Sequence, residues 1–287
     1  MTNEKKIKII IIIFLILIES FVWKVYNSND LSSIGIIGGA DGPTSIIVGE
    51  VNNGLKNGNH SGPDVIIREH NDSSKNNENQ TEGDDNRIEL LKEAVEKGLL
   101  IIVNKENPLS MDYKPDDLKE IKYFVPDRSE ASRYMRAEAA DAFHQMVDKA
   151  AESGVEIKMT TAYRSYHFQK VLYDNYVASY GQAAADTFSA KPGQSEHQTG
   201  LAVDVSSPSV GYQLTIDYGE KNEGKWLAEN AHKFGFIIRF PKGKEDITGF
   251  QYEPWHLRYV GLTAAKEIHE QGLTLEEFLQ QNVIKKW

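Results

Sequence analysis

Cysteine is absent from all 287 residues, so the chain offers neither disulfides nor thiolates that could bind a metal or attack a substrate. The same absence excludes a cysteine peptidase and a lipoprotein anchor, which requires a cysteine for lipid attachment. Basic residues are also few relative to acidic ones, 32 against 42, and the formal net charge is −10. A chain without a basic excess is not expected to bind nucleic acid.

One unbroken apolar run stands near the amino end. It covers residues 9–18 and follows lysines at positions 5, 6 and 8. Ten residues suit a signal-peptide core, but no Ala-x-Ala cleavage site follows, and residues 7–26 approach the roughly 20 positions that a bilayer requires. We therefore predict that residues 1–30 form an uncleaved, single-pass signal anchor in the cell membrane. Lysines before the run place the remainder of the chain outside the cytoplasm; the alternative is a buried core helix.

Residues 31–86 are predicted to form an extracytoplasmic linker. From about residue 51 to residue 86 the chain is rich in Asn, Asp, Gly, Ser and Glu and has no aromatic residue, a composition typical of a solvated tether. The glycine-rich segment 34–44 is similar to a motif in the beta subunit of sodium-translocating decarboxylases. That similarity covers only about a dozen residues, so it does not predict an ion-transport function for this chain. We interpret the segment as turn-forming.

Residues 87–287 are expected to form one compact domain, since about 200 residues suffice for one core. Apolar spacing predicts helices at 136–151, which Gly154 would end, and at 224–232. Apolar or alternating segments predict strands at 155–162, 201–205, 236–240 and 252–260. Helices and strands follow one another without regular alternation. The predicted fold class is therefore α+β, with flanking helices around a small antiparallel sheet whose face carries the site.

Two short stretches of the predicted domain contain ligands suited to a metal. His197 and Asp204 lie in the first, and Glu253 and His256 in the second. Two neutral imidazoles and one aspartate can fill three corners of a zinc tetrahedron and leave the fourth for water, as hydrolytic zinc requires. Zinc (Zn²⁺) is the predicted cofactor, although such a site would accept other divalent metals.

The spacing of these ligands predicts how the chain presents them. His197 is expected in a loop after residues 192–193, and Asp204 on a strand whose valines face the core. Glu253 and His256 are three apart with Pro254 between them, which excludes the helical His-Glu-x-x-His pattern. Both can reach one metal only if Pro254 bends the chain, and Trp255 is expected to anchor that bend in the core.

Two further charged residues have candidate catalytic roles. Glu253 can accept a proton from a metal-bound water and pass it to the leaving amine, or it can orient a ligand histidine. Arg164 follows the strand predicted at 155–162. Its permanently charged guanidinium group can donate hydrogen bonds to an oxyanion or to a substrate carboxylate. The sequence does not choose between these two roles of Arg164.

These motifs together resemble the VanY-type zinc D,D-carboxypeptidases over roughly the last two-thirds of the chain. Several separated motifs occur in the right order: Tyr163-Arg164-Ser165, Ser195-Glu196-His197 with Gly200 and Asp204, Gly224-Lys225-Trp226, Tyr252-Glu253-Pro254-Trp255-His256 and Arg258-Tyr259-Val260-Gly261.

The resemblance implies a role for each matching residue. Zinc would be held by His197, Asp204 and His256, with Glu253 as base and acid and Arg164 helping the transition state. Four residues are expected to bind substrate: Gln169, Ser195, Tyr163 and Trp255. The family removes the terminal D-alanine from peptidoglycan stem peptides. The expected partners are thus precursor peptides ending in D-Ala-D-Ala, and some members act in glycopeptide resistance.

Two other functions compete with this one. A zinc L,D-carboxypeptidase or wall endopeptidase of the same fold would differ only in which stem-peptide bond it cleaves. A non-catalytic, zinc-dependent wall-binding module is the other alternative. Glu253 and Arg164 argue against such a module, because binding a metal alone requires neither of them.

Overall fold

The computed structural model describes residues 65–67, 78–126 and 128–285. The predicted signal anchor at 1–30 and the glycine-rich segment at 34–44 lie outside these ranges. Within the described ranges, no helix has both the length and the apolar character that crossing a membrane requires.

A four-stranded antiparallel sheet forms the centre of the fold. Its strands lie in the order β4 (Lys158–Thr161), β5 (Ala202–Ser206), β7 (His256–Tyr259) and β6 (Phe236–Ile238). Two smaller antiparallel pairs join β2 (Leu118–Glu120) to β3 (Tyr134–Arg136) and β1 (Val65–Ile67) to β8 (Val283–Lys285). The prediction of an α+β fold with a small antiparallel sheet is confirmed.

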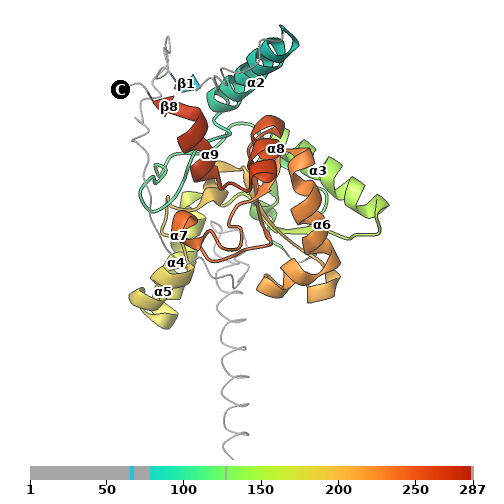
Figure 1. Cartoon of the computed structure of the whole chain (residues 1–287). Coiled ribbons are helices and arrows are strands. Elements are labelled where there is room, and N and C mark those ends of the chain that lie inside the picture. The colour runs from blue at the N-terminus through green and yellow to red at the C-terminus, as the bar shows by residue number, and fades with distance from the viewer. Residues whose placement is uncertain (1–64, 68–77, 127, 286–287) are drawn as a thin grey trace, which may run out of the picture.

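Helices surround this sheet in two groups. Figure 1 shows α3, α6 and α8 on one side of the domain and α4, α5 and α7 on the other. The helices are α2 (Glu78–Glu96), α3 (Ala137–Glu152), α4 (Tyr166–Tyr180), α5 (Gln182–Phe188), α6 (Asn222–Asn230), α7 (Glu245–Thr248), α8 (Leu262–Gln271) and α9 (Leu275–Asn282). In the described part of the chain, short 3-10 turns lie between these elements: η1 (Glu130–Ser132), η2 (Glu196–Thr199), η3 (Pro208–Val210), η4 (Ile216–Glu220) and η5 (Ala231–Phe234).

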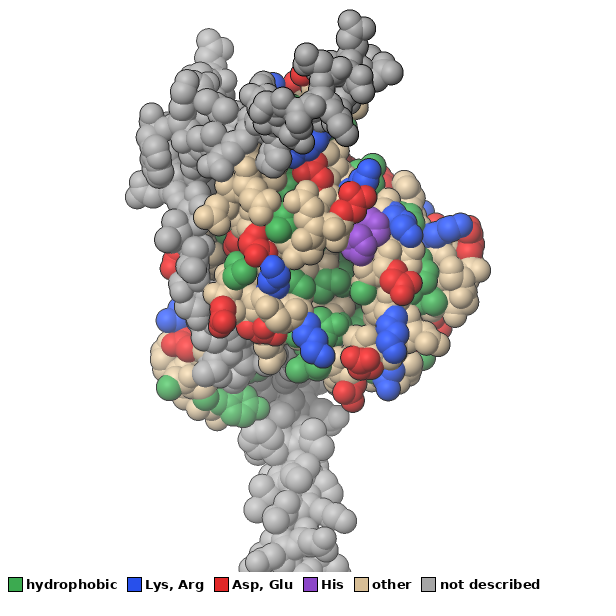
Figure 2. All heavy atoms as spheres, viewed as in Figure 1, with side chains coloured by type: hydrophobic (Ala, Val, Ile, Leu, Met, Phe, Trp, Pro, Cys, Tyr) green, Lys and Arg blue, Asp and Glu red, His purple; other side chains and the backbone are tan. Residues whose placement is uncertain are grey.

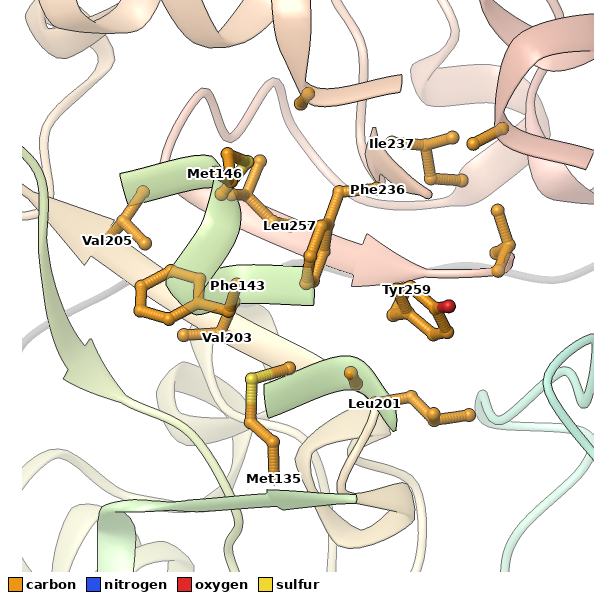
Figure 3. Packing of buried hydrophobic residues seen from close by; sticks show 14 of the residues in the cluster. Met135, Phe143, Met146, Leu201, Val203, Val205, Phe236, Ile237, Leu257 and Tyr259 are labelled. Carbon is orange, nitrogen blue, oxygen red and sulfur yellow. The ribbon is translucent and has the colours of Figure 1, made fainter. Parts of the chain in front are cut away.

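The hydrophobic core lies between α3 and one face of the sheet. The apolar residues that predicted α3 are buried, and Gly154, with φ of 73°, follows its last turn. Phe143 of α3 meets Phe236 of β6 edge to face, with ring centroids 6.3 Å apart. Figure 3 shows these rings near alternate residues of the two central strands, Val203, Val205, Leu257 and Tyr259, and near Leu201, which directly precedes β5. Burying each large apolar side chain contributes roughly 1.5–3 kcal/mol to folding.

Part of the segment predicted as a linker has regular structure. Strand β1 pairs with β8, and α2 begins at Glu78, so the boundary placed at residue 86 falls inside that helix. Composition could not reveal this, because β1 finds its partner at the far end of the chain. Arg87 of α2 forms an ion pair with Glu267 of α8, with Nε to Oε1 at 2.6 Å, and donates a hydrogen bond to Asn282 of α9.

Charged side chains of both signs are interspersed over the molecular surface in Figure 2. Lysines and arginines lie between acidic residues on this face rather than gathering in one area. Mixed charges of this kind give no extended field of one sign on the face shown.

The packing of α3 against the sheet can be tested with a cavity. Replacing Phe143 with Ala should lower the free energy of unfolding by about 3–5 kcal/mol, because a fully buried ring leaves a space that its neighbours only partly fill. Urea unfolding followed by circular dichroism measures this. Lys149→Ala, on the exposed side of the same helix, should change stability by less than about 0.5 kcal/mol. Equal effects of the two substitutions would contradict the described packing.

Candidate metal centre

The register of the central strands brings polar side chains together on the sheet face that points away from α3. Asp204 of β5 pairs with His256 of β7, and Thr161 of β4 pairs with Asp204. Residues paired across antiparallel strands point to the same face, and successive residues alternate between faces. The valines flanking Asp204 therefore enter the core, as the sequence predicts, while Asp204 and His256 lie side by side.

A bulge in β4 contributes to this alignment. The register shifts between Met159 and Thr161, so that Thr160 has no partner of its own in β5. Its hydroxyl donates a hydrogen bond to the backbone oxygen of Asp204, at 3.2 Å. A bulge of this kind redirects the next side chain, and here it places Thr161 opposite Asp204.

His197 lies in η2, a 3-10 turn at the position where a loop was predicted. Its Nδ1 is 2.7 Å from the backbone oxygen of Ala162, and a carbonyl can only accept, so Nδ1 carries the hydrogen. The opposite nitrogen, Nε2, is 3.2 Å from Asp204 Oδ2. Gly200 then ends the turn with φ of 69°, where a Cβ would lie only 3.1 Å from Leu118 Cδ2. The bend that lets His197 face Asp204 therefore favours glycine.

His256 reaches the same point through a tight turn. Its backbone N–H donates to the oxygen of Glu253 at 3.2 Å, with Pro254 as the second residue of the turn, a position that proline favours. The predicted bend at Pro254 is therefore present. His256 Nδ1 lies 3.0 Å from Asp204 Oδ1. Trp255 belongs to the hydrophobic core, as expected of a residue that anchors the turn, and its predicted contact with substrate stays a prediction.

The three predicted ligands fit a divalent metal. One ligand atom from each of His197, Asp204 and His256 lies within 4.8 Å of the other two, and all three residues are buried. Two imidazoles and a carboxylate form a common donor set of catalytic zinc, which keeps a fourth position for water. The second ring nitrogen of His197 already binds a backbone oxygen, the arrangement that fixes the tautomer of a metal-binding histidine.

The buried donors have unusual proton affinities in the metal-free chain. Burial disfavours ionised Asp204, but the imidazoles of His197 and His256 outweigh it and hold the pKa of Asp204 well below its usual range. Burial lowers the pKa of His197. Burial alone would also lower the pKa of His256, but the carboxylates of Asp204 and Glu196 on either side of its ring raise it to about 10. Without metal, His256 is therefore the protonated histidine at neutral pH.

Glu253 lies beside the three ligands rather than among them. Its Oε2 is 4.0 Å from His256 Nδ1, the nitrogen that faces Asp204, and the residue is 1% exposed. Its backbone N–H donates to the oxygen of Phe240 at 3.0 Å. A buried carboxylate at this place can take a proton from a water held by the metal.

Arg164 and Gln169 are hydrogen-bonded to each other, and Arg164 also contacts the backbone of His197. The backbone N–H of Arg164 donates to the oxygen of His197 at 3.2 Å, and its Nη1 donates to Gln169 Oε1 at 2.7 Å. Gln169 in turn donates to the backbone oxygen of Ala190 at 2.6 Å. Ser165 caps the start of α4 by accepting from the Phe168 N–H, which fixes the residue before it. The Arg164 guanidinium is thereby held near the metal ligands.

The remaining two residues predicted to bind substrate are also near this site. Ser195 is buried directly before η2. Tyr163 is buried beside Arg164 in the chain, and its burial raises the pKa of its hydroxyl.

Sequence reasoning assigned no role to Glu196, a buried carboxylate next to His197. Its Oε1 accepts from Arg239 Nε at 2.8 Å and from Arg258 Nη1 at 2.7 Å. Burial would raise the pKa of Glu196, but the two guanidinium groups outweigh it and hold the pKa well below its usual range. The sequence contains a sign of this buried ion pairing. Arg239 interrupts an apolar segment, and Arg258 lies two residues after His256, on the same face of the strand.

Comparison with known proteins places these residues in a family context. Residues 132–262 match the family model described as VanY, D-alanyl-D-alanine carboxypeptidase. A putative carboxypeptidase of Bacillus subtilis (strain 168), YodJ, is 48% identical over 187 residues, which cover 64% of this chain and 68% of the relative.

Two solved structures are similar as well. The LD-carboxypeptidase LdcB has 49% sequence identity and a TM-score of 0.61, over 64% of this chain and 86% of that one. A variant of the vancomycin resistance D,D-pentapeptidase VanY, from a VanB-type resistance cassette and in complex with Zn(II), has 36% identity and a TM-score of 0.52. The match covers 63% of this chain and 98% of that one.

Metal binding should release a proton from His256. Because its pKa is raised to about 10 in the metal-free chain, the imidazole is protonated at pH 7.5, and a metal binds only the deprotonated nitrogen. Zinc affinity should therefore rise with pH, by about tenfold per unit between roughly pH 7 and pH 9. Titration calorimetry in buffers of different ionisation enthalpy measures the protons released. Release of none, with affinity independent of pH, would show that His256 is already neutral.

Proposed function

Because this chain belongs to the VanY family of carboxypeptidases, we propose that it is a zinc-dependent enzyme that removes the C-terminal D-alanine from peptidoglycan stem peptides. One observation carries the proposal: His197, Asp204 and His256 converge in a buried cluster with the Glu253 carboxylate beside it. A module that only bound metal would need the cluster but not the carboxylate.

The proposed division of labour follows from the geometry. When bound by the three ligands, zinc supplies the Lewis acidity that brings the pKa of a coordinated water toward neutrality. Glu253, whose Oε2 is 4.0 Å from His256 Nδ1, would accept a proton from the attacking water and return it to the leaving amine. Arg164, held by Gln169, supplies a fixed positive charge for the oxyanion or for the terminal carboxylate of the peptide.

Two substrates suit this chemistry. The D,D-carboxypeptidase proposal, with a pentapeptide ending in D-Ala-D-Ala, is supported by the description of the matching family model and by the similar D,D-pentapeptidase. The L,D alternative, which takes a tetrapeptide ending in a single D-alanine, is favoured by the higher identity to LdcB, 49% against 36%. A wall endopeptidase of the same fold would use the same residues on an internal bond.

The proposed setting of the enzyme rests on sequence alone. Residues 1–30 would anchor it in the cell membrane, and the remainder would face the wall. Trimming the terminal D-alanine from precursors would also remove the target of glycopeptide antibiotics, so we include a resistance role in the proposal. Loss of pentapeptide precursors on expression of the chain would support that role.

The products of the purified chain test the proposal directly. With zinc present, a muramyl pentapeptide ending in D-Ala-D-Ala should lose one alanine by mass spectrometry, and EDTA should block the loss. Trimming of the tetrapeptide alone would establish the L,D alternative. Inertness toward both peptides with zinc bound would contradict a carboxypeptidase and favour a wall-binding module.

Replacing Glu253 with Gln tests the proton-transfer role. The amide cannot accept the proton, so kcat should fall by about 10²–10⁴ while zinc content stays at the level of the unmodified chain. Metal analysis and steady-state kinetics measure the two quantities. Glu229→Gln, on the exposed surface, is the matched control and should leave both unchanged. Loss of zinc from the Glu253 variant would identify Glu253 as a ligand, and full activity would remove it from the mechanism.

A further inference from the structure

Glu196 adjoins a predicted metal ligand in the chain, yet its carboxylate lies on the far side of the other histidine. His256 Nδ1 faces Asp204 Oδ1 at 3.0 Å, whereas His256 Nε2 faces Glu196 Oε2 at 3.6 Å. The two nitrogens of one imidazole point in different directions. Glu196 therefore does not share the point at which the three ligand atoms converge, and it is not a fourth ligand.

Two buried polar atoms face each other on the side of the His256 ring that points away from Asp204. Among the described residues, neither Glu196 Oε2 nor His256 Nε2 has a hydrogen-bond partner, and both atoms are buried. A buried polar group left without a partner destabilises the folded chain. The two atoms are one acceptor and one potential donor, and a shift of a few tenths of an ångström would join them.

Two arginines fix the carboxylate of Glu196 through its other oxygen, Oε1. Oε1 accepts from both Arg239 and Arg258. Arg239 also donates to Glu276 of α9, with Nη1 to Oε2 at 2.9 Å, and Arg258 donates to the backbone oxygen of Ile101 at 2.7 Å. Both arginines are at most 1% exposed, so two buried positive charges are matched by Glu196 and Glu276. Buried charges are tolerated when paired in this way.

We propose that Glu196 is a positioning residue of the metal centre, whose Oε2 accepts the Nε2–H of His256 and so presents Nδ1 to the metal. The inference rests on the proposed function, since it assumes that the cluster binds zinc. A carboxylate behind a metal-binding histidine fixes the ring and its tautomer. If Glu196 only neutralised the two arginines, its Oε1 would be sufficient for that role. Its Oε2 would then have no reason to face His256.

Replacing Glu196 with Gln separates these two roles. An amide has one acceptor oxygen, and if that oxygen serves the arginines, its NH₂ group faces the Nε2–H of His256 as a second donor. The full chain carrying Glu196→Gln should therefore bind zinc about 10–100-fold more weakly, as measured by competition with a chromophoric chelator. The matched control is Glu276→Gln, which removes the outer partner of Arg239 but leaves the neighbour of His256 in place.

The control should lose thermal stability while keeping the zinc affinity of the unmodified chain. Unchanged zinc affinity in Glu196→Gln would overturn the proposal, and so would an equal loss in both variants. Failure of the unmodified chain to bind zinc is a distinct result, because it would refute the proposed function itself along with this inference.

A measurement on the unmodified chain remains decisive if Glu196→Gln does not fold. Long-range ¹⁵N–¹H correlation of ¹⁵N-histidine-labelled, zinc-loaded protein reports which nitrogen of each imidazole carries the hydrogen. The proposal predicts a protonated Nε2 and a metal-bound Nδ1 for His256. A metal-bound Nε2 would overturn it.

Discussion

The antiparallel pairing of β5 with β7 is the constraint on which the remainder of the structure depends. Its register sets Asp204 directly opposite His256, and alternation along the same strands sends Val203 and Leu257 into the core beneath α3. A slip of one residue would exchange the two faces, burying the carboxylate in the core and exposing the valines. Hydrophobic packing on one face therefore fixes the alignment of metal donors on the other.

The polar face of the sheet is nevertheless almost as buried as the core, so its charged groups are largely shielded from water. Asp204, His197 and His256 are each no more than 5% exposed, so each charge requires a partner within the protein. Asp204 is paired with the two histidines themselves. Glu196, next to His197 in the chain, is paired with Arg239 and Arg258, and Arg239 also pairs with Glu276. A metal ion with a +2 charge would enter a site whose own carboxylates, Asp204 and Glu253, already favour it.

The solved structures similar to this chain are named for different carboxypeptidase activities. Similarity extends to an LD-carboxypeptidase and to a D,D-pentapeptidase, so membership of the family does not by itself select the bond that the proposed enzyme would cleave. Selection must involve groups that contact the peptide beyond the scissile bond. Arg164 is one such candidate, since it lies next to His197 and is oriented by Gln169.

The sequence by itself determined which residue types form the site, that Pro254 bends the chain, and that the fold is α+β, because spacing along the chain expresses these features locally. Only the tertiary structure decided which ring nitrogen of each histidine faces Asp204, that Thr160 bulges out of β4, and that Glu196 lies behind His256. It also decided that α2 begins inside the predicted linker. These features depend on pairing between segments far apart in the chain, which local periodicity does not encode.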